Sequence, residues 1–142
     1  MKYLGIDYGT KRIGVAVSDE NGTLAFPKDV LESSPSAVFD VANLYAALGC
    51  GAVVIGESAD NTGGKNKVNA NIHEFGDALK NKISGAVYYI DESFTSADAH
   101  GRQGKSSLLS RVTKFHIPKK LDASAAALIL QRYLDKEGKK QT

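Results

Sequence analysis

Short β-rich runs dominate the start of the chain. Residues 2–8 and 12–18 are mostly apolar or β-branched and flank a turn at residues 9–11, which predicts a two-stranded hairpin. A second turn, at residues 20–22, leads into an expected third strand near residues 23–26. The chain therefore opens with three strands, and we expect the first of them to be central in a sheet.

Beyond this point the apolar spacing alternates between that of helices and that of buried strands. The expected elements are a helix opened by Ser34 and Pro35 and stopped at Gly49, a strand at 52–56, a polar loop at 57–66, a helix at about 67–81, a strand at 86–90, and a helix from about 122 to 137. Three strands followed by alternating helices and strands predict an α/β fold, with a mixed sheet covered by helices.

Composition adds bounds to this picture. A length of 142 residues suits one domain, which we place at residues 1–137 with a basic tail at 138–142. The single cysteine, Cys50, excludes an internal disulfide and favours a reducing compartment. No apolar run approaches the roughly 18 residues that a membrane span requires. We expect a cytoplasmic protein.

Charge is distributed unevenly along the chain. Residues 99–121 contain six lysines and arginines and no acidic residue. Such a stretch suggests a polyanion partner, because neutralisation of phosphates dominates the affinity of proteins for nucleic acids. The alternative is a solvated loop and helix face, and charge alone does not decide between them.

Three acidic residues stand out on this scaffold. Asp7 lies inside an apolar strand, where an uncompensated carboxylate costs several kcal/mol and a bound cation is one means of compensation. Glu92 follows a buried strand, at the edge where open α/β sheets bind ligands. Asp122 opens the last helix, whose apolar face should pack on the sheet, so we expect Asp122 to point inward.

Each acid also has a structural explanation. Asp7 could initiate the turn that follows it. Glu92 could cap a helix, although Thr95 and Asp98 already form a plausible capping box. Asp122 could be an ordinary N-cap.

Taken together, the three acids suggest a metal site. Clustered carboxylates with few histidine or cysteine ligands available suit Mg²⁺ or Mn²⁺, which prefer oxygen. His73, His100 and His116 share no metal-like spacing, and we expect them to be surface or structural residues. Two such ions about 4 Å apart activate water and stabilise the leaving oxygen of a phosphodiester.

Four segments of the chain carry a family resemblance. Residues 5–16, 53–56, 91–96 and 121–131 resemble, in order and spacing, the motifs of the YqgF family, also called RuvX, whose members are assigned as Holliday junction resolvases or pre-16S rRNA nucleases. The resemblance covers essentially the whole domain. Its first and last motifs are fairly specific, whereas the middle ones are weak alone.

The resemblance implies a ribonuclease H-like fold with a five-stranded mixed sheet and a divalent-metal phosphodiesterase site. It implies that Asp7, Glu92 and Asp122 are the family's acidic triad, catalytic and metal-binding. It further implies maturation of the 5′ end of 16S rRNA, with cleavage of Holliday junctions as the alternative. Mg²⁺ or Mn²⁺ would be the cofactor.

Two departures from the family pattern matter. Ser93 stands where arginine usually follows the acidic pair, which could weaken phosphate binding or shift it to Arg102 or Lys105. Glu57 and Ser58 stand where Leu-Pro is common. Glu57 could therefore be a fourth acid near the metal, or a solvent-exposed loop residue.

The expected partner is nucleic acid, either precursor rRNA or branched DNA. Its candidate contacts are Lys11 and Arg12 in the hairpin turn and Arg102 and Lys105 in the basic stretch. A non-catalytic nucleic-acid-binding module remains a rival function. An actin-like ATPase would need a second domain and a second phosphate loop, for which this chain has no room. The sequence leaves the oligomeric state open.

Overall fold

A single mixed sheet organises the protein. The computed structural model describes residues 1–57, 63–91 and 121–141. Its strands are β1 (Tyr3–Tyr8), β2 (Arg12–Ser18), β3 (Ala25–Glu32), β4 (Ala52–Glu57) and β5 (Ala86–Asp91). They lie in the order β3-β2-β1-β4-β5. The pairs β1–β2 and β2–β3 are antiparallel, whereas β1–β4 and β4–β5 are parallel. The predicted five-stranded mixed sheet, with the first strand at its centre, is confirmed.

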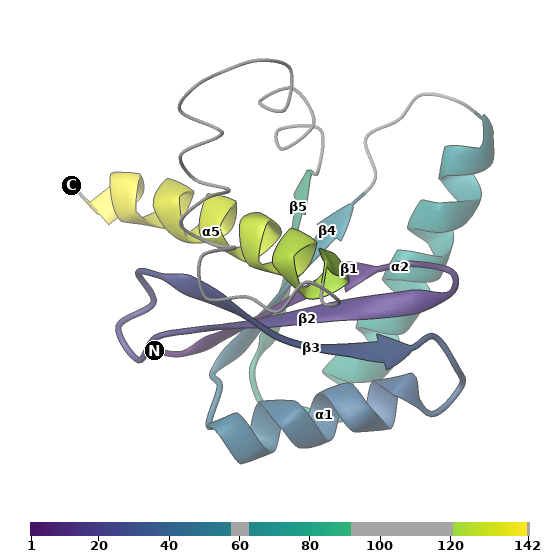
Figure 1. The fold of residues 1–142 in the computed structure, drawn as a ribbon, viewed down its shortest axis with the longest axis horizontal. Helices are drawn as coiled ribbons and strands as arrows, with labels where there is room; N and C mark the ends of the chain where they lie inside the picture. The colour runs from purple at the N-terminus through teal and green to yellow at the C-terminus, as the bar shows by residue number, and fades with distance from the viewer. Residues whose placement is uncertain (58–62, 92–120, 142) are drawn as a thin grey trace.

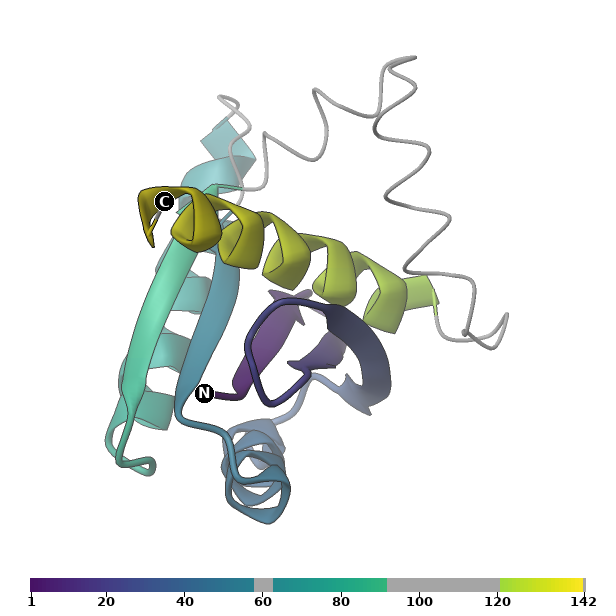
Figure 2. The same ribbon diagram turned by 90° about the vertical axis from the view of Figure 1, so that its left-hand side faces the viewer.

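Helices cover both faces of this sheet (Figures 1 and 2). On one face, α1 (Ala37–Leu48) and α2 (Gly63–Lys80) enclose a core that includes Ile6, Ile13 and Ile55. On the other face, α5 (Leu121–Gln141) crosses β1, β2, β3 and β4 and packs against Ala16 and Val54. The apolar side expected for the last helix is confirmed, since Ala126 and Ile129 are buried. Cys50 is also buried, as a small core residue.

The third strand is longer than its sequence suggests. We expected it near residues 23–26, but β3 runs from Ala25 to Glu32. Pro27, followed by the polar residues Lys28 and Asp29, is typical of a segment that ends a strand. However, β3 is the edge strand beside β2, and an edge strand tolerates a proline because one side of it needs no ladder hydrogen bonds.

Helix ends also differ from the expectation. Ser34 was expected to cap the first helix, but α1 is capped at Ser36, and Ser34 instead accepts a turn hydrogen bond from the N–H of Ala37. The predicted stop at Gly49 is confirmed: this residue is left-handed, with φ 71°, a conformation that glycine adopts without strain.

Glycines within the other two helices were misleading. The second helix was expected from residue 67, with a loop over 57–66, but α2 begins at Gly63; residues 58–62 of that loop lie outside the described part. The last helix was expected to end near residue 137, but α5 continues through Gly138 to Gln141. A glycine in a helix costs only about 1 kcal/mol relative to alanine. None of the helices in the described residues is long and apolar enough to cross a membrane.

Candidate active site

The parallel strands bring three acidic residues to one edge of the sheet. Because β1, β4 and β5 are parallel, their carboxyl ends meet there (Figure 1). Asp7 lies near the end of β1, Glu57 ends β4, and Asp91 ends β5 as the register partner of Glu57. This is the edge at which open α/β sheets bind their ligands.

Side-chain alternation divides this edge between the two faces. Leu4, Ile6 and Tyr8 belong to the core under α1 and α2, so Asp7, between Ile6 and Tyr8, faces α5. The same alternation along β4 places Glu57 with Ile55, on the face of α2. Asp7 and Glu57 therefore point to opposite sides of the sheet.

The path of α5 leads its first turn toward Asp7. The ring of Tyr3, at the start of β1, lies 5.7 Å from that of Tyr133. Two residues further, a Cβ on Gly5 would lie 2.7 Å from the Cβ of Leu130 and 3.2 Å from the carbonyl oxygen of Ala126, so only glycine fits there. The helix thus runs antiparallel to β1. Asp7 lies two residues beyond Gly5 on β1, in the direction of the N-terminal end of α5.

This arrangement bears on Asp122. Because α5 begins at Leu121, Asp122 lies in its first turn, at the end of the helix that approaches Asp7. The side chain of Asp122 and the whole of Glu92 lie outside the described residues. The convergence of the three acids therefore stays a prediction. The course of the backbone supports it for Asp7 and for the first turn of α5, which contains Asp122.

Glycines surround Asp7 on its own face of the sheet. Its cross-strand partner on β2 is Gly14, and on β4 Gly56 follows Ile55, the partner of Ile6. Asp7 is half-buried, and the two positions that flank it, on β2 and on β4, are glycines and carry no side chain. Sequence reasoning missed these glycines, because only the strand register shows that they flank Asp7.

Glu57, considered above as a fourth metal-proximal acid, has a partner on the face of the sheet opposite Asp7. Its carboxylate is hydrogen-bonded to Nε2 of His73 on α2, at 2.5 Å. The imidazole of His73 lies against the ring of Tyr89, with ring centroids 4.3 Å apart. Burial raises the pKa of Tyr89, and the charges of Asp77 and Glu57 add to that effect. Glu57 and His73 form a structural pair on the face opposite Asp7.

The basic candidates fall into two groups. Lys11 and Arg12 are exposed at the hairpin between β1 and β2, next to the carboxyl end of β1. Arg102 and Lys105 lie outside the described residues, as does Ser93. Within residues 1–57, 63–91 and the described part of α5, no three acidic, histidine or cysteine side chains form a cation site. That observation does not include Glu92 or the Asp122 side chain.

Known proteins resemble this chain over nearly its full length. A family model described as "RuvX: Holliday junction resolvase" matches residues 1–136. A "Putative pre-16S rRNA nuclease" of Maridesulfovibrio salexigens is 31% identical over 94% of this chain and 98% of its own length. A protein of the same name from Chloroflexus aggregans is 36% identical over 93% of this chain and 92% of its own length.

Solved structures share the fold at low sequence identity. RuvC of T. thermophilus in complex with a Holliday junction substrate has a TM-score of 0.65 and 15% identity, covering 96% of this chain and 95% of that one. The Fowlpox virus resolvase, in complex with Holliday junction DNA, has a TM-score of 0.58 and 14% identity, covering 96% of this chain and 98% of that one. These likenesses establish the fold.

Proposed function

Because the chain belongs to the RuvX Holliday junction resolvase family, we propose that it is a divalent-metal-dependent nuclease that processes the 5′ end of pre-16S rRNA. The names of its relatives, which specify pre-16S rRNA, support this choice of substrate. Precursor rRNA is an intracellular substrate, so the proposal includes a cytoplasmic location, in keeping with a single cysteine that forms no internal disulfide.

The surroundings of Asp7 carry this proposal. The carboxylate is half-buried in the central strand, is flanked by Gly14 and Gly56, and lies on the face covered by α5, whose first turn contains Asp122. Carboxylate oxygens are the donors that Mg²⁺ and Mn²⁺ prefer. The carboxylate of Asp7 therefore has the donor chemistry that such an ion needs.

In this mechanism Asp7, Glu92 and Asp122 would hold Mg²⁺ or Mn²⁺. When bound, the metal lowers the pKa of a water nucleophile and stabilises the charge on the leaving oxygen of the phosphodiester. The protein contributes fixed positions for the carboxylates, on a central strand and on a helix packed tightly against Gly5. Lys11 and Arg12 hold phosphates of the nucleic-acid backbone beside the site, and Arg102 and Lys105 extend that contact.

Cleavage of Holliday junctions is the second candidate. Its support is the likeness of the fold to a resolvase with a junction bound. A resolvase cuts two strands related by symmetry and therefore needs two active sites, so this function requires a dimer. A monomer in solution would favour the linear rRNA precursor.

A cleavage assay with precursor 16S rRNA and a four-way DNA junction side by side tests the proposal. We expect the precursor to be cut at its 5′ side in Mg²⁺ or Mn²⁺ and left intact in EDTA. Preferred cutting of the junction would indicate that the protein acts in DNA recombination instead. Tight binding without cleavage of either substrate would identify a binding module instead.

A further inference from the structure

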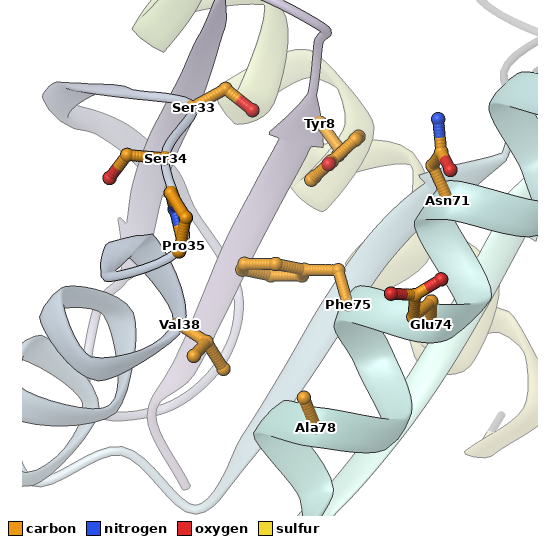
Figure 3. A pocket seen from close by; sticks show the side chains of 9 residues that line it. All are labelled: Tyr8, Ser33, Ser34, Pro35, Val38, Asn71, Glu74, Phe75 and Ala78. Atoms are coloured by element: carbon orange, nitrogen blue, oxygen red, sulfur yellow. The ribbon is translucent and has the colours of Figure 1, made fainter.

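A cavity of about 310 Å³ lies on the face of the sheet opposite Asp7. It is formed by the end of β1, the segment that leads into α1, and one side of α2 (Figure 3). Its size falls within the range of small-molecule sites in proteins. Neither the metal site nor the Glu57–His73 pair uses it.

The cavity has apolar walls and a polar rim. Phe75 and Val38 line its inner part, and the ring of Tyr8 lies 5.2 Å from that of Phe75. In Figure 3, Asn71 and Glu74 stand on the α2 side of the cavity, and Ser33 stands across from them beyond Tyr8. An aromatic surface with two hydrogen-bonding side chains on its α2 side is suited to a flat, polar-edged ring.

The cavity also adjoins the proposed cleavage site. Tyr8 follows Asp7 directly, about 3.8 Å along the backbone, and the two side chains point to opposite faces. The carbonyl of Lys11 accepts a hydrogen bond from the N–H of Ser33 at 3.0 Å, which holds the hairpin turn at the rim. The turn that this hydrogen bond holds beside Ser33 carries the exposed Lys11.

We propose that this cavity binds a guanine base of an unpaired nucleotide that flanks the scissile phosphate. The base would lie against Tyr8 and Phe75, and the phosphate that links it to the cleavage site would meet Lys11. The inference rests on the proposed nuclease function for the polymer that supplies the base. It adds a base preference to that function.

Glu74 selects guanine among the four bases. The Watson–Crick edge of guanine presents two adjacent N–H donors, which a carboxylate accepts together, whereas adenine and cytosine offer that carboxylate a single amino group and uracil a single ring N–H. Asn71, one turn earlier on α2, adds an amide donor for the carbonyl oxygen of guanine. The negative charge of Glu74 also disfavours a bare phosphate in the cavity.

Equilibrium dialysis of the full chain against GMP, AMP, CMP and UMP, in EDTA, tests the inference without relying on cleavage. We expect GMP to bind at least roughly tenfold more tightly than AMP, as for a two-bond base contact. Glu74→Gln should reduce GMP binding to the level of AMP. Asp77→Asn, which removes another exposed carboxylate of α2 outside the cavity, should preserve the preference.

Equal binding of the four nucleotides, no binding of any, or a guanine preference that survives in Glu74→Gln would overturn the inference. Because Glu74 is exposed, the substitution leaves the core untouched, and circular dichroism verifies the fold. The two proposals fail separately. A guanine preference that Glu74→Gln abolishes, in a protein that cuts no substrate, supports the cavity and contradicts the nuclease. Metal-dependent cleavage without a nucleotide preference supports the nuclease and contradicts the guanine site.

Discussion

The two faces of the sheet differ most at the carboxyl end of β1. On the α5 face, Asp7 is flanked by Gly14 and Gly56. On the α2 face, Tyr8 packs near Phe75, and Glu57 is paired with His73. Acidic residues near the ends of neighbouring strands can therefore lie on opposite sides of the sheet, because side chains alternate along each strand. Proximity at a sheet edge does not by itself define a metal site.

Substitution of Asp7 gives the largest effect that this comparison predicts. Asp7→Asn keeps the size of the side chain but removes a negative oxygen ligand, so metal-dependent cleavage should fall by at least roughly 1,000-fold. Binding of RNA, measured by fluorescence anisotropy, should persist because the basic residues remain. Cleavage at the wild-type rate by Asp7→Asn would remove this residue from the mechanism.

Gly5→Ala tests the packing that brings α5 to β1. The new methyl group would lie 2.7 Å from the Cβ of Leu130, so the helix must shift. We expect a loss of about 1–3 kcal/mol in the free energy of unfolding, seen in urea titrations, and a Tm lower by roughly 3–10 °C. Cleavage should fall as well, because the first turn of α5 moves relative to Asp7.

Gly138→Ala is the matched control, since no atom lies within 4 Å of the Cβ that it would add. That variant should be as stable as the wild type, or more stable by up to about 1 kcal/mol. Equal loss of stability in both variants would contradict tight packing at Gly5.

Alkaline pH should affect the two faces unequally. On the α5 face, burial raises the pKa values of Tyr3 and Tyr133, and Tyr133 also stacks against Tyr88 at 5.5 Å. The tyrosines of the unfolded chain therefore lose their protons first, from about pH 10. Their contribution to the free energy of unfolding is fully present below that pH and decreases above it. Tyr133→Phe should lessen the decline between pH 9 and 11 in urea titrations.

Tyr89 on the α2 face, whose pKa burial also raises, provides the comparison. Tyr89→Phe should lessen the alkaline decline less than Tyr133→Phe, since Tyr133 has the larger upward shift. An identical decline in the wild type and in Tyr133→Phe would show that Tyr133 does not contribute to the alkaline loss of stability.

The smallest effect is expected for Glu57→Gln. Because Glu57 lies on the opposite face from Asp7 and bonds to His73, its loss should leave the cleavage rate within about twofold of the wild type. Cleavage kinetics in Mg²⁺, run beside Asp7→Asn, provide the measurement. A loss of cleavage rate close to that of Asp7→Asn would indicate that Glu57 belongs to the metal site.

Local sequence predicted those features that depend on local chemistry. The apolar residues around Asp7 identified a central strand, and Gly49 identified the end of a helix. Pro27 was misleading because it lies on an edge strand, where its missing N–H is tolerated. Gly138 was misleading because one glycine costs a helix only about 1 kcal/mol, which does not end α5.

The surroundings of the site depend on contacts between distant segments. That Gly14 and Gly56 flank Asp7 follows from the pairing of β1 with both β2 and β4, which no single segment encodes. The partnership of Glu57 with His73 likewise needs the register of β4 and the position of α2. The cavity beside Tyr8 is built from three separate parts of the chain and has no signal in any one of them.

Crystals grown with Mn²⁺ and measured for anomalous scattering test the metal site most directly. We expect Mn²⁺ at about 2.0–2.2 Å from a carboxylate oxygen of Asp7, with Glu92 and Asp122 completing the protein ligands, and no ion in crystals of Asp7→Asn. Manganese bound at Glu57 and His73 instead, or bound equally in the wild type and in Asp7→Asn, would contradict this assignment.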